Sequence, residues 1–488
     1  MGPSAIPDLA FAPLDCDAPS AAPTAPRVVL ISTYDLGHSP FGLASPAAWL
    51  ARAGFAVTLN DLAVQELDHD AIAAATMVAF YLPMHTATRM ALRALDPVRA
   101  RRPDVPVGFF GLYAPMNEAL LRARGAAFVV GGEFEPGLVH AARRIAAGEP
   151  VDSVSSPSIS HERLEFLVPE RAGLPPLERY ARLRVDGEER VAGYTEASRG
   201  CRHRCRHCPV VPVYDGRFRI VPREVVLEDV ARQVAAGARH VTFGDPDFWN
   251  GIGHARPLVQ ELHRRFPDLT YDVTIKVEHL LRHAQHLAEL RDTGCAFVTS
   301  AVESVDDSVL ATLEKGHTRA DVVEVVRRCR DVGLPLQPTF VAFTPWTTAA
   351  GYLDLLDTLA DLDLIEHVAP VQLAIRLLIP SGSRLLELPE VQGWIEPFDP
   401  VALVHRWRHP DPAVDRLQRD VEGRVAAAAA SGEVRPDVFR SVLRLAEDLT
   451  GRARRPLAPP SVAAGAIPTM SEPWYCCAEP LPESASPI

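Results

Sequence analysis

The sequence predicts an α/β protein with a doubly wound N-terminal domain, then a partial (β/α)6 barrel, then a helical C-terminal extension. Short apolar runs rich in β-branched residues alternate with amphipathic segments along two long stretches, which is typical of parallel sheets covered by helices. A stretch of good helix formers follows the second series. Hydrophobic residues make up 47% of the 488 residues, which is enough for more than one core.

The first alternating series spans residues 27–150 and predicts a Rossmann-like domain. It follows residues 1–26, a Pro- and Ala-rich leader that we expect to be disordered. Strands are predicted at Arg27–Ser32, Ala56–Leu59, Met77–Tyr81, Val107–Phe110 and Ala127–Val130. Helices are predicted between them, near Pro46–Ala53, Asp68–Ala75, Thr86–Arg101 and Met116–Arg124.

The second series predicts a barrel over residues 181–384, after a polar, Pro-interrupted linker at 151–180. A hairpin is expected around Asp186-Gly187, because Asp-Gly suits a type I′ turn. Strands are predicted around Val191–Tyr194 and at His240–Phe243, Thr270–Lys276, Phe297–Val302, Leu336–Phe343 and Val368–Leu377. Helices are predicted from Pro222 to about Ala236 and near 254–265, 279–293, 319–332 and 348–361. Six such β/α units can form a full or partial barrel.

The remaining chain has two parts. Residues 385–452 predict helices, because the run Ala426–Ala430 is a strong helix former. Residues 453–488 form a Pro-rich tail that carries Cys-Cys-Ala-Glu-Pro at positions 476–480.

The composition of the chain limits the classes of partner that we expect. The net charge of -12 and pI near 5.8 lack the basic footprint of a dedicated nucleic-acid binder. No apolar run is long enough to predict a membrane span, and the leader has no secretory pattern. We therefore expect a cytoplasmic protein with reduced cysteines and with neither a membrane nor a nucleic-acid partner.

Three cysteines crowd one loop after the predicted strand near Tyr194. Cys201, Cys205 and Cys208 have the spacing C-x3-C-x2-C, and Arg and His residues surround them. Thiolates are soft ligands that suit iron–sulfur clusters, zinc and copper(I). Because an ordinary [4Fe–4S] cluster takes four cysteines, three thiolates would leave one iron open to another ligand. The positive side chains favour thiolate over thiol.

Two other interpretations of this loop stay open. A structural zinc site could take His203 or His207 as its fourth ligand. Typical zinc sites pair two C-x2-C halves that lie far apart, and the sequence has no second half. A basic nucleic-acid loop with incidental cysteines is the other alternative.

The motif and its place at the start of a β/α barrel resemble the radical S-adenosylmethionine (SAM) superfamily. The resemblance implies a [4Fe–4S] cluster on Cys201, Cys205 and Cys208. It also implies reductive cleavage of SAM to a 5′-deoxyadenosyl radical, which abstracts a hydrogen atom. The superfamily usually has an aromatic residue before the third cysteine. His207 stands there, as is familiar in the cobalamin-associated branch.

Candidates for contact with SAM follow the second predicted barrel strand, since barrel active sites form at strand ends. Gly244, Asp245 and Asp247 lie where the superfamily places a Gly-Gly-Glu-like segment that binds the SAM amino group. The resemblance therefore implies that one of the two carboxylates has this role. A simple turn is the alternative, because Gly-Asp-Pro suits one.

Two later strand ends offer further candidates. Glu303 and Ser304 could hydrogen-bond a ribose, and the alternative for Ser304 is helix capping. Lys276 could pair with the SAM carboxylate or with Glu278.

Gly131 and Gly132 end the last predicted strand of the first domain and would allow close approach of a ligand to the backbone. The arrangement resembles the cobalamin-binding domain that precedes many radical SAM barrels. Residues Tyr34–His38 lack the spacing Asp-x-His-x-x-Gly, so we expect no lower histidine ligand to cobalt. The resemblance implies bound cobalamin. A degenerate domain kept as a scaffold or for substrate docking is the alternative.

The whole chain resembles the radical SAM proteins with a Cys-Cys-Ala-Glu-Pro tail, in some of which selenocysteine replaces the first cysteine. Cys476 and Cys477 are adjacent cysteines in a Pro-rich segment with no core to fill. We expect them to take part in catalysis through redox or metal chemistry, since strained vicinal disulfides are labile. A recognition tag, or chance, is the alternative.

Taken together, the residues and the resemblance predict a radical SAM enzyme that methylates or rearranges an unknown small molecule or peptide, with cobalamin as a further cofactor. A flavodoxin or ferredoxin would supply its electrons. Two alternatives stay open: radical sulfur or selenium chemistry that involves the tail cysteines, and a non-catalytic iron–sulfur protein for redox sensing or binding.

Overall fold

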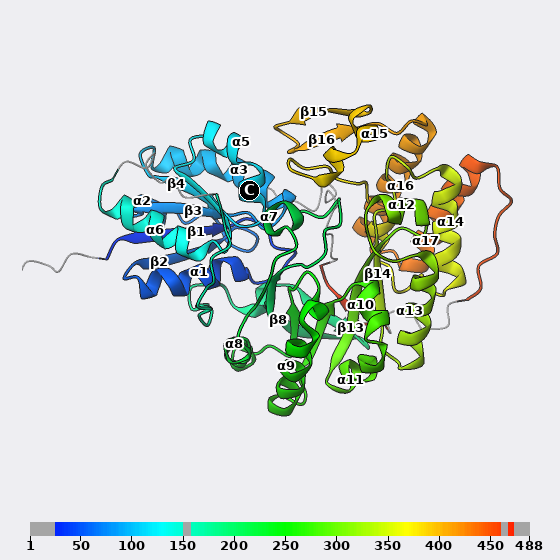
Figure 1. Cartoon of the computed structure of the whole chain (residues 1–488), viewed down its shortest axis with the longest axis horizontal. Helices are drawn as coiled ribbons and strands as arrows, with labels where there is room; N and C mark the ends of the chain where they lie inside the picture. The colour runs from blue at the N-terminus through cyan, green and yellow to red at the C-terminus, as the bar shows by residue number, and fades with distance from the viewer. Residues whose placement is uncertain (1–24, 150–157, 460–466, 473–488) are drawn as a thin grey trace, which may run out of the picture.

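The computed structural model describes residues 25–149, 158–459 and 467–472. Figure 1 shows the N-terminal domain (blue to cyan) beside the barrel (green), with the C-terminal helices (yellow to orange) on the far side of the barrel. The predicted α/β fold class is confirmed. Most of the predicted leader and the tail cysteines Cys476 and Cys477 lie outside the described residues.

The N-terminal domain is a parallel sheet with the strand order β2-β1-β3-β4-β5-β6. Its strands are β1 (Arg27–Ser32), β2 (Ala56–Asp61), β3 (Met77–Tyr81), β4 (Val107–Phe110), β5 (Phe128–Gly132) and β6 (Ile159–Ser160). Its helices are α1 (Phe41–Arg52), α2 (His69–Ala73), α3 (His85–Arg101), α4 (Tyr113–Met116), α5 (Glu118–Ala123) and α6 (Glu135–Ala146).

Both faces of this sheet are buried because side chains alternate along each strand. Val29 and Ile31 pack with residues of α2, α3 and α5. Val28 and Leu30 face the other way and pack with α1 and α6. The domain is therefore doubly wound, as predicted.

Two boundaries differ from expectation. Helix α1 begins at Phe41 and contains Pro46, which was expected to start it. Pro46 is the sixth residue of this helix, past the first turn in which proline costs least, so it removes one hydrogen bond from the helix interior. β6 comes from the segment predicted as a linker, and it adds an edge strand beside Gly131 and Gly132.

The barrel sheet has the order β14-β13-β12-β11-β8-β7-β17. Its five parallel strands are β8 (Glu188–Thr195), β11 (His240–Phe243), β12 (Thr270–Thr274), β13 (Cys295–Glu303) and β14 (Leu336–Phe340). β7 (Arg182–Val185) pairs antiparallel with β8, and the turn residues Asp186 and Gly187 have φ of 51° and 78°. The predicted type I′ hairpin is confirmed.

Helices cover the outside of this sheet (Figure 1). They are α8 (Arg223–Ala235), α9 (Ile252–Arg265), α10 (Val277–Arg282), α11 (Leu287–Asp292), α12 (Asp307–Thr312), α13 (Arg319–Asp331) and α14 (Ala349–Asp361). The helix predicted at 279–293 is divided, with a 3-10 turn, η4 (Ala284–His286), between α10 and α11.

The prediction of a sixth strand at Val368–Leu377 was wrong. That segment contains the 3-10 helix η5 (Pro370–Leu373) and meets the sheet only at a parallel bridge between Phe343 and Arg376. The Gln372 side chain accepts a hydrogen bond from the backbone N–H of Phe340 at 3.0 Å. A side chain thus takes the place that a strand carbonyl would fill.

The C-terminal extension is not wholly helical as expected. It begins with η6 (Arg384–Glu387) and α15 (Pro389–Gln392), followed by an antiparallel pair, β15 (Ile395–Asp399) and β16 (Val404–Trp407). Helices α16 (Pro412–Ser431) and α17 (Arg435–Thr450) then contribute apolar side chains to the barrel core. The last described strand, β17 (Thr469–Met470), pairs antiparallel with β7.

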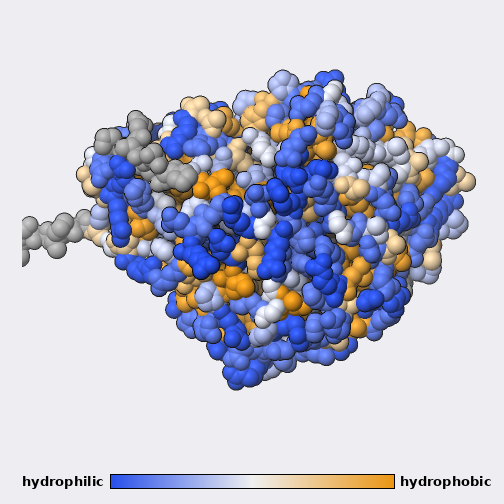
Figure 2. All heavy atoms as spheres, in the orientation of Figure 1, coloured by the Kyte–Doolittle hydropathy of each residue, from blue (hydrophilic) through white to orange (hydrophobic). Residues whose placement is uncertain are grey.

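Polar side chains cover most of the face in Figure 2, with apolar patches between them. Within the described ranges, no helix combines the length and apolar character needed to cross a membrane.

Candidate functional site

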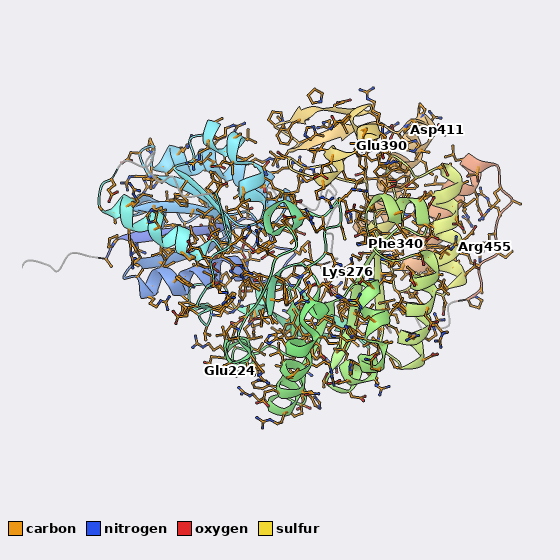
Figure 3. The ribbon with its side chains drawn as sticks, viewed as in Figure 1. Glu224, Lys276, Phe340, Glu390, Asp411 and Arg455 are labelled. Carbon is orange, nitrogen blue, oxygen red and sulfur yellow. The ribbon has the colours of Figure 1, made fainter. Side chains whose placement is uncertain are left out.

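A cavity of about 360 Å³ lies where the carboxyl ends of the barrel strands face the N-terminal domain. This volume is in the usual range for small-molecule sites. Figure 3 shows Lys276, which lines it, near the centre of the molecule, whereas Glu224, Glu390, Asp411 and Arg455 lie at the periphery.

The N-terminal domain contributes the loops that follow β1 and β3. Asp35, Leu36 and His38 come from the first loop, and Pro83 and Met84 from the second. The strand order reverses at β1, because β2 lies on one side of it and β3 on the other. Ligands of open α/β sheets bind in the crevice outside the carboxyl ends of the strands at such a point. The three cysteines line the same cavity as this crevice.

His38 is packed rather than solvated. Its ring lies 4.7 Å from that of Tyr194 on the barrel, and burial lowers the pKa of His38 to about 4. Burial, together with repulsion from Asp61 and Glu196, raises the pKa of the Asp35 carboxyl well above its usual value. The crevice therefore presents an uncharged imidazole at neutral pH, beside a carboxyl group whose pKa is raised.

Cys201, Cys205 and Cys208 also line the cavity, on the loop between β9 (Ser198–Gly200) and α7 (Val211–Tyr214). Asn250 holds this loop: its Nδ2 donates to the Cys201 Sγ at 3.5 Å, and its Oδ1 accepts from the Arg202 N–H at 3.3 Å. Burial raises the pKa of the Cys201 thiol. A positive partner is therefore needed to keep this thiol ionised.

Two buried lysines lie near the other two thiols, Cys205 and Cys208. Lys276 Nζ donates to Cys205 Sγ at 3.7 Å. Lys315 Nζ lies 3.3 Å from Glu303 Oε1. Burial alone would lower the pKa of Lys315, but the Glu303 carboxylate and the thiols of Cys205 and Cys208 raise it well above its usual value. Lys315 is therefore charged beside the thiols.

Glu303 is the buried counter-charge. It lies at the end of β13 with φ of 72°, a conformation that non-glycine residues rarely adopt. Burial would raise its pKa, but Lys315 and then His207 lower it to about 2. His207 Nε2 lies 3.1 Å from Glu303 Oε1. The carboxylate thus stays ionised inside the cavity.

Gly244 and Asp245 line the cavity at the end of β11. A Cβ atom on Gly244 would lie 1.8 Å from the Tyr194 hydroxyl, so only glycine fits there. The Asp245 carboxylate accepts hydrogen bonds from the Ala197 N–H at 2.9 Å and from the Ser198 hydroxyl. Burial raises the Asp245 pKa to about 7. Its contacts therefore hold the strand that leads to the cysteines.

Three other predicted residues lie outside the cavity lining. Ser304 accepts a hydrogen bond from the Asp306 N–H at 3.1 Å and belongs to a turn. Asp247 is fully buried behind the cysteine loop, next to His203 and His279. A Cβ on Gly131 would meet the Pro115 ring at 2.3 Å, so packing explains this glycine.

Gly132 does line the cavity, with φ of +68°. A Cβ there would lie 2.2 Å from the Ser160 carbonyl oxygen of β6. The predicted pairing of Lys276 with Glu278 does not form, because Glu278 pairs with Arg282.

The sequence reasoning missed Lys315, because it lies in a turn rather than at a strand end. One simple signal could have found it. Of the 50 basic residues in the chain, only Lys276 and Lys315 are lysines, and all others are arginines. Both line the cavity. The compact ammonium group of lysine differs from the planar guanidinium of arginine in size and hydration. Because lysine occurs only at this cavity, we infer that the cavity requires an ammonium group rather than a guanidinium.

Arg199 was also missed. It lies directly before the cysteine loop and is 6% exposed. Its guanidinium binds Glu135 through two hydrogen bonds of 2.7 and 3.0 Å, and it contacts Glu133 at 3.4 Å and Glu196 at 3.0 Å. Glu133 and Glu135 belong to the N-terminal domain. This network therefore fixes that domain against the cysteine loop.

Comparison with known proteins agrees with this geometry. Residues 195–346 match the radical SAM superfamily. The chain is 25% identical over 179 residues to the ribosomal protein uS12 methylthiotransferase RimO of Porphyromonas gingivalis, which covers 35% of this chain and 41% of the relative. A probable threonylcarbamoyladenosine tRNA methylthiotransferase of Archaeoglobus fulgidus is 24% identical over 229 residues, covering 44% and 52%. The chain thus spans about half or less of these relatives.

Two solved structures share the fold over most of the chain. The radical SAM methyltransferase TsrM from Kitasatospora setae, with tryptophan substrate and a SAM analogue, has a TM-score of 0.56 at 21% identity and covers 75% of this chain and 76% of its own. The cobalamin-dependent SAM radical enzyme OxsB, with aqua-cobalamin and SAM bound, has a TM-score of 0.67 at 14% identity, covering 83% and 67%. Residues 195–346 of this chain, which carry the three cysteines, are a radical SAM superfamily domain.

Proposed function

We propose that this protein is a cobalamin-dependent radical SAM enzyme that methylates or rearranges a substrate of unknown identity. The observation that carries the proposal is the position of the three thiols. Cys201, Cys205 and Cys208 line the same cavity as the loops after β1 and β3 of the N-terminal domain. Cofactors held by the cysteines and by these loops would share that space.

The donor set fits a [4Fe–4S] cluster. Three soft thiols converge, buried lysines beside them offset anionic charge, and Asn250 Nδ2 donates to a sulfur. Hydrogen bonds and charges of this kind tune iron–sulfur sites. When bound, the cluster supplies the electron that cleaves SAM reductively.

The charged groups beside the thiols would bind SAM. The ammonium groups of Lys276 and Lys315 are suited to its carboxylate, and the ionised Glu303 to its amino group or ribose hydroxyls. His207 and Lys315 hold the Glu303 carboxylate in place. Gly244 leaves the backbone open, and Asp245 positions the strand before the cysteines.

The crevice residues fit cobalamin in position and character. Tyr81, Leu112 and Phe134 line this side with apolar and aromatic surface. Cobalamin held here would supply a methyl group or a radical partner. Gly132 lies at the same edge of the sheet, where its positive φ turns the chain.

We further propose that Cys476 and Cys477 act at this cavity. Thr469, Met470 and Glu472 line it, and the Tyr34 hydroxyl donates to Glu472 at 2.8 Å. Strand β17 holds the segment against β7. Cys476 comes four positions after Glu472, a length that spans at most about 14 Å. The anchor therefore supports delivery of the tail thiols to the cavity. The comparisons do not favour the sulfur or selenium chemistry or the non-catalytic role left open above.

The test is anaerobic reconstitution with iron and sulfide, reduction in the presence of SAM, and mass spectrometry. We expect 5′-deoxyadenosine from the wild type and from Cys329→Ala, whose thiol is buried in the core on α13. Cys205→Ala should form no 5′-deoxyadenosine. Formation of S-adenosylhomocysteine as a second product, together with cobalamin absorption in the protein, supports methyl transfer. Zinc without iron in the wild type would overturn the proposal.

The tail is tested separately with the double variant Cys476→Ser/Cys477→Ser. We expect SAM cleavage to persist and formation of the final product to fall. Unchanged product formation would exclude the tail thiols from the mechanism.

A further inference from the structure

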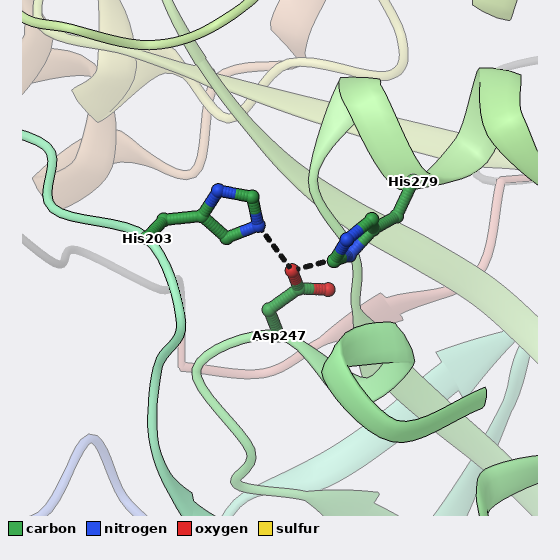
Figure 4. Close-up of side chains that lie close together, drawn as sticks. All are labelled: His203, Asp247 and His279. Atoms are coloured by element: carbon green, nitrogen blue, oxygen red, sulfur yellow. Dashed lines mark ion pairs between the residues drawn. The ribbon is translucent and has the colours of Figure 1, made fainter. Parts of the chain in front are cut away.

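Three side chains behind the cysteine loop converge from three different segments (Figure 4). His203 lies between Cys201 and Cys205, Asp247 follows β11, and His279 is on α10. Asp247 Oδ2 lies 2.7 Å from His279 Nδ1 and 3.4 Å from His203 Nε2. All three atoms lie within 4.8 Å of one another.

These atoms are buried and unsatisfied. Asp247 is 0% exposed and His279 is 6% exposed. Within the described part of the chain, none of the three atoms has a partner in hydrogen-bonding geometry. Buried polar atoms almost always have one, since leaving one unpaired costs about 1–3 kcal/mol. The two histidines therefore attract the carboxylate, but neither ring makes a hydrogen bond to it.

A shared cation accounts for this arrangement. Ligand atoms about 2.0–2.2 Å from one metal ion lie about 3.0–3.4 Å apart for octahedral or tetrahedral geometry. The contact of Asp247 with His203 has that spacing, and the contact with His279, at 2.7 Å, is somewhat shorter. In a hydrogen bond the N–H would instead point at the carboxylate oxygen.

The surroundings also match a metal site. The other carboxylate oxygen, Asp247 Oδ1, accepts from the backbone N–H groups of Trp249 at 3.3 Å and Lys276 at 3.4 Å, which fixes its orientation. The other ring nitrogen of His203 lies 3.7 Å from a Glu278 carboxylate oxygen. Metal-ligating histidines commonly face a carboxylate in this way, and it sets the tautomer.

We propose that His203, Asp247 and His279 form a mononuclear site for a divalent first-row transition metal, distinct from the cysteine site. Two imidazoles and one carboxylate suit Zn²⁺ or Fe²⁺. The ion pins the cysteine loop to β11 and α10, and it leaves a coordination position for water. Its role is to fix the geometry of the cysteine loop both before and after the cysteines bind their cluster.

The experiment measures metal content of the full chain by mass spectrometry, after chelator treatment, anaerobic reconstitution and addition of Zn²⁺. We expect about one Zn²⁺ per chain beyond the iron in the wild type. Asp247→Asn and His279→Gln should each lower the affinity by at least about tenfold. His283→Gln, whose residue follows the same helix, should retain the metal.

The triple variant Cys201→Ala/Cys205→Ala/Cys208→Ala separates this site from the cysteine site. It should lose iron and keep Zn²⁺. Its Co²⁺ form should show d–d absorption without a thiolate charge-transfer band. Any of three results would overturn the proposal. These are loss of zinc together with the cysteines, no zinc in the wild type, and zinc retention by folded Asp247→Asn and His279→Gln equal to that of the wild type. Circular dichroism establishes folding, and His203→Gln replaces either variant if it does not fold.

Discussion

Replacing Arg199 with methionine should destabilise the contact between the N-terminal domain and the barrel. The Glu133 and Glu135 side chains that it contacts are 1% and 0% exposed. Arg199→Met would leave these carboxylates buried without their cation, while the apolar part of the side chain is kept. Removing one partner of a buried ion pair costs about 3–5 kcal/mol. Glu135 should account for most of this cost, because Glu133, whose pKa is already raised to about 7, can take up a proton when its cation is removed.

The assay is urea unfolding monitored by circular dichroism, with Arg232→Met as the matched control. Arg232 forms a 3.0 Å pair with Glu228, but these side chains are 51% and 52% exposed, so its loss should cost less than about 1 kcal/mol. Arg199→Met/Glu135→Gln should recover part of the loss because it removes one stranded charge. If Arg199→Met costs no more than Arg232→Met, the network does not hold the domains as argued.

Three further predictions concern the same region. Burial raises the pKa of Glu133 to about 7. The folded protein therefore binds the extra proton, and stability falls as pH rises from about 4.5 to about 7. Glu133→Gln should flatten this part of the curve of unfolding free energy against pH, and an unchanged slope would refute the assignment. Gly244→Ala should lower the free energy of unfolding by about 1–3 kcal/mol, because the added Cβ would crowd Tyr194. Gly253→Ala should leave it unchanged, since nothing lies within 4 Å of a Cβ there. Equal melting temperatures of the two variants would contradict this. Lys315→Arg keeps the charge but not the compact shape, so 5′-deoxyadenosine formation should fall about tenfold or more; wild-type activity would show that charge alone suffices.

Much of the fold was predictable because strand signals are local. The apolar runs Arg27–Ser32, Met77–Tyr81 and Val107–Phe110 are strands with those bounds. Errors arose where a long-range contact decided the outcome. Val368–Leu377 has strand-like composition, but the Gln372 side chain bonds to β14 and the chain forms a 3-10 turn instead. Strand β17 has only two residues, and it exists because β7 offers a free edge.

The same distinction between local and long-range contacts applies to the candidate site. The cysteines Cys201, Cys205 and Cys208 lie within eight residues, so their spacing alone brings the thiols together. Lys315 reaches Glu303 only because α12 turns the chain back toward the end of β13. Asp247 was expected near SAM from its place after β11. The structure instead turns it toward two histidines behind the loop.

By itself the sequence determined the alternating α/β pattern, the type I′ turn at Asp186-Gly187 and the ligand set of the cysteine loop. Each depends on side-chain periodicity, backbone preference or ligand spacing within a short segment. Only the tertiary structure decided that Arg199 binds carboxylates of the other domain, that both lysines line the cavity with the thiols, and that Thr469, Met470 and Glu472 line it as well. These contacts join residues far apart in the chain, and packing of the two sheets sets their distances.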